Sequence, residues 1–184
     1  MDSSQLIFIV SLPRSGSTLL QRLLSNNTKV TTTSETWLPL YLFQAWQPLP
    51  SIAPYDTGLA HWAIKDFEQK IPAKSLQNQL AKVVLNSYEP LIGNADFFLE
   101  KTPRNYLVVE RLTETMPDAK FIFLQRNPED IFRSIIQTHQ LKSIQPMTYY
   151  GVDLFEGMPL MAKYSNETPT PANHRVVAYE DLVQ

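Results

Sequence analysis

Short apolar runs alternate along this chain with longer stretches in which apolar residues recur at helical spacing. The first run, residues 6–10, is rich in β-branched and aromatic side chains, which is typical of a buried strand. Leu19, Leu20, Leu23 and Leu24 then follow the spacing of an amphipathic helix. Further strands are predicted at residues 29–33, 97–100, 120–125 and 175–179.

Helices are predicted between these strands. Ser75 and Asn105 are each expected to cap a helix, Pro128 suits the first turn of another, and residues 180–182 open a last one. Because strands alternate with helices, the sequence predicts a three-layer α/β fold, with a central parallel sheet and helices on both faces. Such sheets bind ligands beyond the carboxyl ends of their strands.

Prolines are unevenly distributed. The chain has 14 prolines and only 5 glycines, and many prolines fall in residues 39–90 and 146–171. Proline interrupts helix interiors, so both stretches are predicted to be irregular or to form short broken helices, with residues 151–170 as loop. Four residues near this loop are available to line a site: Tyr149, Tyr150, Phe155 and Met158.

Residues 11–18 form a small-residue loop between the first predicted strand and helix. A loop in this position directs backbone N–H groups and a helix dipole at an anion. Arg14 adds a planar set of donors that suits phosphate or sulfate oxygens, while Ser15, Ser17 and Thr18 add hydroxyls. The sequence therefore predicts a phosphate-binding loop; the alternative is a strand–helix corner without a ligand.

The loop differs from the pattern G-x-x-x-x-G-K-[ST] of nucleotide triphosphatases. Aligned on Gly16, the chain has Ser11 at the first glycine and Ser17 at the lysine. The missing lysine argues against an ordinary ATPase or kinase. Instead, Arg14, Lys101 and Arg126 each follow the end of a predicted strand, and three cations at one sheet edge favour an anionic ligand.

Composition narrows the classes of protein. A chain of 184 residues that is 43% hydrophobic and 18% charged predicts one globular domain, residues 1–184. The net charge of −2 argues against a nucleic-acid partner. There is no cysteine, no stretch near the ~20 apolar residues of a membrane span, and no cluster that indicates a metal site. A cytoplasmic location is predicted.

Two motifs together resemble the cofactor site of sulfotransferases that use 3′-phosphoadenosine 5′-phosphosulfate (PAPS). Residues 13–18 are similar to the family's 5′-phosphosulfate loop, and residues 126–134 to its 3′-phosphate site. The resemblance implies that Arg126 and Ser134 hold the 3′-phosphate. Eight residues are just over two helical turns, so both side chains can lie on one side of a helix. The motif style is similar to that of tyrosylprotein sulfotransferases and related bacterial proteins.

The same resemblance implies the remaining roles. Glu35 lies twenty-one residues after Arg14, at the position of the family's general base on the acceptor hydroxyl, although Ser34 replaces a usually acidic neighbour. Lys101 is implied to stabilise charge on the transferring group or the leaving oxygen. The residues implied to bind the phosphosulfate are Arg14, Ser15, Gly16, Ser17 and Thr18. No metal is required, because arginine and lysine supply the charge.

The implied reaction moves a sulfuryl group from PAPS to an acceptor hydroxyl and leaves adenosine 3′,5′-bisphosphate. A protein tyrosine, a sugar, a lipid or a small molecule are all open as acceptor. The family continues beyond the Tyr-Glu-Asp-Leu segment at residues 179–182, so the domain is expected to lack the C-terminal part of the fold. The alternatives are a non-catalytic or truncated nucleotide- or anion-binding relative and, less favoured, a P-loop phosphotransferase.

Overall fold

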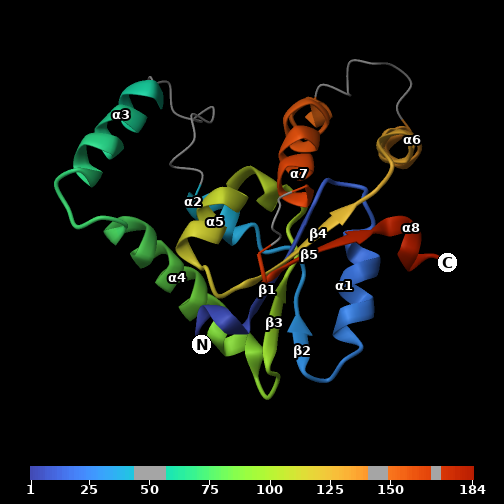
Figure 1. The fold of residues 1–184 in the computed structure, drawn as a ribbon, viewed down its shortest axis with the longest axis horizontal. Helices are drawn as coiled ribbons and strands as arrows, with labels where there is room; N and C mark the ends of the chain where they lie inside the picture. Colours follow the sequence, from blue (N-terminus) through green and yellow to red (C-terminus); the bar gives the residue numbers. More distant parts are fainter. Residues whose placement is uncertain (44–56, 141–148, 167–170) are drawn as a thin grey trace.

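The computed structural model describes residues 1–43, 57–140, 149–166 and 171–184 (Figure 1). Its centre is a parallel five-stranded sheet in the order β2-β3-β1-β4-β5. The strands are β1 (Leu6–Ser11), β2 (Val30–Thr32), β3 (Phe97–Glu100), β4 (Lys120–Gln125) and β5 (His174–Ala178). Every predicted strand is present, and the prediction of a parallel sheet is confirmed.

Helices connect the strands. They are η1 (Ser3–Gln5), α1 (Ser17–Ser25), α2 (Leu38–Phe43), α3 (Thr57–Glu68), α4 (Ser75–Ile92), η3 (Pro103–Val108), α5 (Val109–Thr115), α6 (Pro128–His139), η5 (Val152–Gly157), α7 (Met158–Ser165) and α8 (Tyr179–Leu182). The short elements η1 and η3 are 3-10 helices, and η5 is a π-helix. None of the described helices has both the length and the apolar character of a membrane span.

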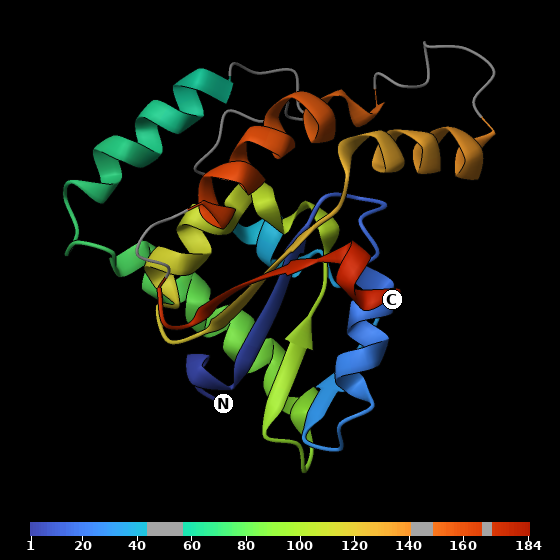
Figure 2. The same cartoon turned by 45° about the vertical axis from the view of Figure 1, so that its right-hand side comes forward.

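Two apolar cores cover the two faces of the sheet. Alternate residues of β1 point to opposite faces, so Phe8 belongs to one core and Ile9 to the other. The first core packs against α2, α4, α5 and α7, for example through Leu112. The second packs against α1 through Leu20 and against α8 through Leu182, and α1 and α8 lie side by side in both views (Figure 2). The predicted three-layer arrangement is confirmed.

Helices also occupy much of the two proline-rich stretches. The loop predicted at residues 151–170 is wrong, because η5 and α7 cover residues 152–165; residues 167–170 lie outside the described residues. Pro39 and Pro159 are each the second residue of a helix, a position at which proline is tolerated. Pro90 lies inside α4, two residues before its end, where it removes one backbone hydrogen bond of the helix.

Two predicted helix caps are wrong. Lys74 precedes α4 with φ +60°, and Ser75 is the first residue of that helix. Asn105 lies inside η3 and is fully buried, and its amide donates a hydrogen bond to Oε1 of Glu100 at 3.2 Å. The Asn105 side chain points into the protein, so it donates a hydrogen bond to a buried carboxylate and does not cap a helix.

Candidate active site

The loops that follow β1, β3 and β4 meet at the carboxyl edge of the sheet, because these three strands are parallel and adjacent. They carry Arg14, Lys101 and Arg126, as the sequence predicts. A cavity of about 600 Å³ lies at this edge. All predicted site residues except Ser15 and Lys101 line it: Arg14, Gly16, Ser17, Thr18, Glu35, Arg126 and Ser134.

Two residues with left-handed backbone shape the loop between β1 and α1. Gly16 has φ +92° and immediately precedes α1, and Arg14 has φ +69° although it bears a side chain. A Cβ on Gly16 would lie 2.3 Å from Cδ2 of Tyr179. Position 16 therefore requires glycine for its backbone and for its packing. Strained non-glycine residues such as Arg14 concentrate at functional sites.

The Arg14 side chain reaches across the cavity to α6. Its Nε donates to Oγ of Ser134 at 3.2 Å, and its Nη2 donates to Oγ1 of Thr138 at 2.8 Å. Ser134 and Thr138 are four residues apart and so lie on one face of the helix. Thr138 was not predicted, although its spacing from Ser134 was a usable signal.

The Arg126 guanidinium lies between a backbone carbonyl and an aromatic ring. Its Nη1 donates to the carbonyl oxygen of Arg14 at 3.0 Å, and its Cζ lies 4.2 Å from the centroid of the Tyr179 ring. Its Nε is buried without a hydrogen-bond partner. An unpaired buried donor is unfavourable, so this N–H is suited to a ligand acceptor. Because the Tyr179 ring also packs on Gly16, it joins the loop to Arg126.

Glu35 lines the cavity and pairs with Lys101. The Oε1 atom of Glu35 lies 2.6 Å from Nζ of Lys101. The Lys101 side chain is only 6% exposed, whereas that of Glu35 is 34% exposed. The lysine therefore lies behind the glutamate, and its charge acts on the cavity through this ion pair.

A group of buried polar residues lies behind the ion pair. Glu100 is 1% exposed and accepts hydrogen bonds from Oγ1 of Thr36 at 3.1 Å and from Nδ2 of Asn105. Oγ1 of Thr36 also lies 2.8 Å from the hydroxyl of Tyr88. Burial raises the pKa of Glu100, and the hydrogen bonds that it accepts act in the opposite direction. Burial and the nearby Glu100 carboxylate raise the pKa of Tyr88, so its hydroxyl stays protonated.

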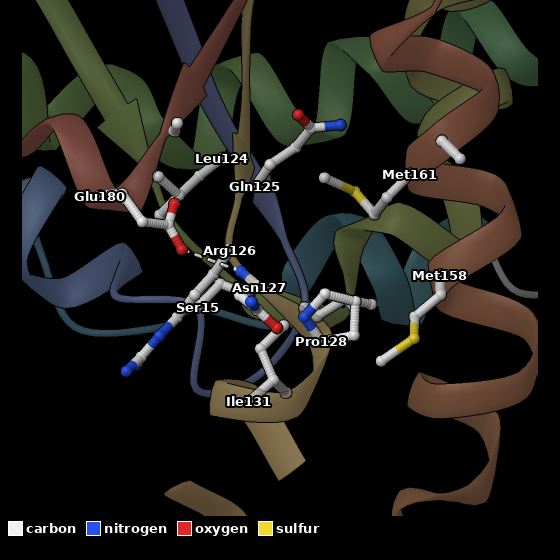
Figure 3. Close-up of a pocket in the computed structure, with 13 residues that line it drawn as sticks. Ser15, Leu124, Gln125, Arg126, Asn127, Pro128, Ile131, Met158, Met161 and Glu180 are labelled. Carbon is white, nitrogen blue, oxygen red and sulfur yellow. Dashed lines mark hydrogen bonds between the residues drawn. The ribbon is translucent and has the colours of Figure 1, made fainter. Parts of the chain in front are cut away.

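The Ser15 side chain lies in a second cavity of about 530 Å³, which Figure 3 shows between the end of β4 and helix α7. Ser15 is 1% exposed, and its Oγ is buried without a partner. Met158 lines the same cavity. At its edge, the backbone N–H of Asn127 donates to Oε1 of Glu180 at 3.0 Å, and this bond lowers the pKa of the Glu180 carboxyl. The loop between β1 and α1 thus borders both cavities, and Arg126 lines both of them.

Arg104 lines the first cavity and was not predicted. Its Nε and Nη2 donate to the two carboxylate oxygens of Asp153 at 3.1 and 2.7 Å, and the hydroxyl of Tyr106 donates to the same carboxylate at 2.7 Å. This pairing with Asp153 raises the pKa of Arg104. The side chain of Asp153 is 2% exposed. The one signal in the sequence for Arg104 was its position as a further cation shortly after Lys101, beyond the end of a predicted strand.

Of the aromatic residues predicted near this edge, Tyr150 lines the first cavity. Its hydroxyl lies 2.6 Å from Nε2 of His139, the last residue of α6. Tyr149 and Phe155 are instead 78% and 81% exposed. Within the described ranges, no three His, Asp or Glu side chains are arranged to hold a metal ion.

Two curated proteins are similar in sequence to this chain. Nodulation protein NoeE of Sinorhizobium fredii is 32% identical over 198 residues, which cover 96% of this chain and 46% of NoeE. An uncharacterized protein of Aquifex aeolicus is 29% identical over 133 residues, 70% of this chain and 16% of its own length. The chain thus spans less than half the length of these curated relatives.

Solved structures share the fold. The sulfotransferase domain of the Synechococcus PCC 7002 olefin synthase matches with a TM-score of 0.61 and 22% identity, over 97% of this chain and 67% of that one. The sulfotransferase domain from the curacin biosynthetic pathway matches with a TM-score of 0.57 and 22% identity, over 96% and 68% of the two chains. A model of the sulfotransferase family matches residues 6–184. The chain therefore belongs to the sulfotransferase family.

Proposed function

We propose that this chain binds PAPS in the cavity beside its phosphate loop and transfers the sulfuryl group to an acceptor hydroxyl. The observation that carries the proposal is that Glu35, Arg14 and Arg126 line one cavity at the start of α1. A carboxylate can take a proton from an acceptor, and the two guanidinium groups can hold anionic oxygens. Membership of the sulfotransferase family supports the reaction class.

The residues of the cavity fit a ligand that carries two phosphate-type groups. Helix α1 begins directly after Gly16, so its first backbone N–H groups face the loop. Arg126 has a buried Nε without a partner. We assign the phosphosulfate to Arg14, Gly16, Ser17 and Thr18, with Ser15 completing the loop, and the 3′-phosphate to Arg126 and Ser134. PAPS, when bound, supplies an activated sulfuryl group on a phosphate leaving group.

Glu35 is the proposed general base. Its carboxylate lies in the cavity wall and is partly exposed, so an acceptor hydroxyl can reach it. A positioned base contributes about 10²–10⁴ in rate. Lys101, 2.6 Å from this carboxylate, holds it in place and stabilises negative charge that develops beside it. The acceptor, the single-domain organisation of residues 1–184 and the cytoplasmic location stay predictions.

The proposal is tested by incubating the protein with ³⁵S-labelled PAPS and a panel of acceptors: a tyrosine peptide, a sugar, a long-chain alcohol and 4-nitrophenol. We expect label on at least one acceptor, and about 10²–10⁴ less label with Glu35→Gln. Glu129→Gln is the matched control, because Glu129 is an 80% exposed glutamate on α6. Undiminished transfer by Glu35→Gln would exclude the base role, and bisphosphate binding without transfer would favour a non-catalytic relative.

A further inference from the structure

Three consecutive residues around Glu35 contact three consecutive residues at the end of β3. Glu35 pairs with Lys101 at 2.6 Å. Thr36 donates through Oγ1 to Oε2 of Glu100 at 3.1 Å, and the backbone N–H of Trp37 donates to Oγ1 of Thr102 at 3.1 Å. Lys101 therefore lies between two residues, Glu100 and Thr102, that form hydrogen bonds with the segment that carries Glu35.

The hydrogen bonds of Thr36 have a defined direction. Its single hydroxyl proton goes to the Glu100 carboxylate, so the protonated hydroxyl of Tyr88 donates to Oγ1 of Thr36, as does the backbone N–H of Leu38 at 3.3 Å. Tyr88 is 2% exposed and belongs to α4. Glu100 accepts a further bond from Asn105 of η3. The buried Glu100 carboxylate and the Tyr88 hydroxyl thus connect Thr36 to β3, α4 and η3.

The backbone at this point is constrained as well. Trp37 has φ +56°, a conformation that is unfavourable for a residue with a side chain. Its N–H bond to Thr102 stabilises this turn, which lies between Glu35 and the start of α2 at Leu38. Because this strained turn directly follows Glu35, it fixes the direction in which the chain leaves the cavity wall.

We infer that Glu100, acting through Thr36, is a positioning residue that holds the Glu35 carboxylate against Lys101 and directed into the cavity. This inference rests on the proposed role of Glu35 as general base. Glu100 is buried and lines neither cavity described above, so it acts on the reaction only by placing its neighbours. Misplacing a reacting group by about 1 Å costs about 10²-fold in rate.

Thr36→Val tests the inference, because it removes the hydroxyl and preserves the shape of the side chain. We expect kcat for ³⁵S transfer to fall about 10²-fold, with an unchanged Kd for adenosine 3′,5′-bisphosphate. Thr36→Ser restores the hydroxyl and should recover most of the rate. Thr113→Val is the matched control: its hydroxyl bonds only the carbonyl of Glu110, on α5. Wild-type kcat in Thr36→Val, or equal losses in Thr36→Ser or Thr113→Val, would overturn the inference.

A spectroscopic readout separates this inference from the proposed function. The ¹⁵N resonance of the Lys101 ammonium group, assigned through its change in Glu35→Gln, reports the ion pair without any acceptor. We expect that signal to shift or broaden in Thr36→Val and in Glu100→Gln and to stay unchanged in Thr113→Val. An undisturbed signal in the first two variants would contradict positioning by Glu100. Lack of sulfuryl transfer by the wild type together with a disturbed signal would refute only the proposed function.

Discussion

Replacing Gly16 with alanine destabilises the fold in two separate ways, through the backbone conformation and through a steric clash of the added methyl group. Gly16 has φ +92°, which residues with a Cβ adopt only at a cost in free energy. The added Cβ would also lie 2.3 Å from Cδ2 and 2.5 Å from Cε2 of the Tyr179 ring. That ring cannot move away without disturbing Arg126, because the guanidinium stacks on it at 4.2 Å.

The magnitude follows from these two costs. The left-handed backbone costs alanine about 1–2 kcal/mol, and overpacking against the ring costs about 1–3 kcal/mol more. We expect Gly16→Ala to lower the free energy of unfolding by about 2–5 kcal/mol. This is a large share of the about 5–15 kcal/mol by which a domain is stable.

Urea unfolding of the wild type, Gly16→Ala, Tyr179→Ala and the double variant separates the two costs. Removing the ring should relieve the steric part, so the double variant should be more stable than the sum of the single effects by about 1–3 kcal/mol. Gly93→Ala is the control, because Gly93 has φ +55° but its Cβ would meet nothing within 4 Å. Effects of Gly16→Ala and Tyr179→Ala that add within about 0.5 kcal/mol would refute the steric argument.

Two further predictions concern buried charge. Burial raises the pKa of Glu100 in the native state above its reference value of 4.5. At pH values between the reference pKa and the raised native pKa, the native state therefore binds more protons than the unfolded state. The free energy of unfolding should fall as pH rises through that window, and Glu100→Gln should lack this fall when both proteins are unfolded in urea from about pH 4 to pH 8. The same pH dependence of stability in the wild type and in Glu100→Gln would contradict the linkage. Asp153→Ala removes the partner of Arg104 and an acceptor of Tyr106, and should cost about 3 kcal/mol, the low end for a buried pair, because Arg104 stays 29% exposed. A loss of stability no larger than that of Glu114→Ala, which breaks the exposed pair with Arg111, would count against it.

The strands and the position of the site could be predicted because both depend on local pattern. The apolar run that became β1 is buried at every residue, and such a run is visible without any knowledge of its neighbours. The carboxyl-edge location of Arg14, Lys101 and Arg126 follows from parallel pairing alone. The positions of Glu35 and Ser134 came from a family resemblance, and the structure brings both into the same cavity.

Other features depend on contacts that no local pattern encodes. Arg104 and Asp153 are 49 residues apart, and their pairing arises only when η5 packs on η3. The Ser15 side chain lies in the neighbouring cavity, whereas the residues on either side of it line the first one. The prediction of a loop at residues 151–170 rests on proline as a helix breaker, but Pro159 lies in the first turn of α7, where proline is tolerated.

The central claim is that the cavity holds a nucleotide with a 3′-phosphate, and calorimetric titration with adenosine 3′,5′-bisphosphate tests it directly. We predict micromolar binding that is lost in Arg126→Gln and absent with ADP. It should be retained in Arg133→Gln, the matched control on α6, whose side chain is 70% exposed. Equal affinity for ADP and the bisphosphate, or full affinity in Arg126→Gln, would contradict the assignment of this cavity to PAPS.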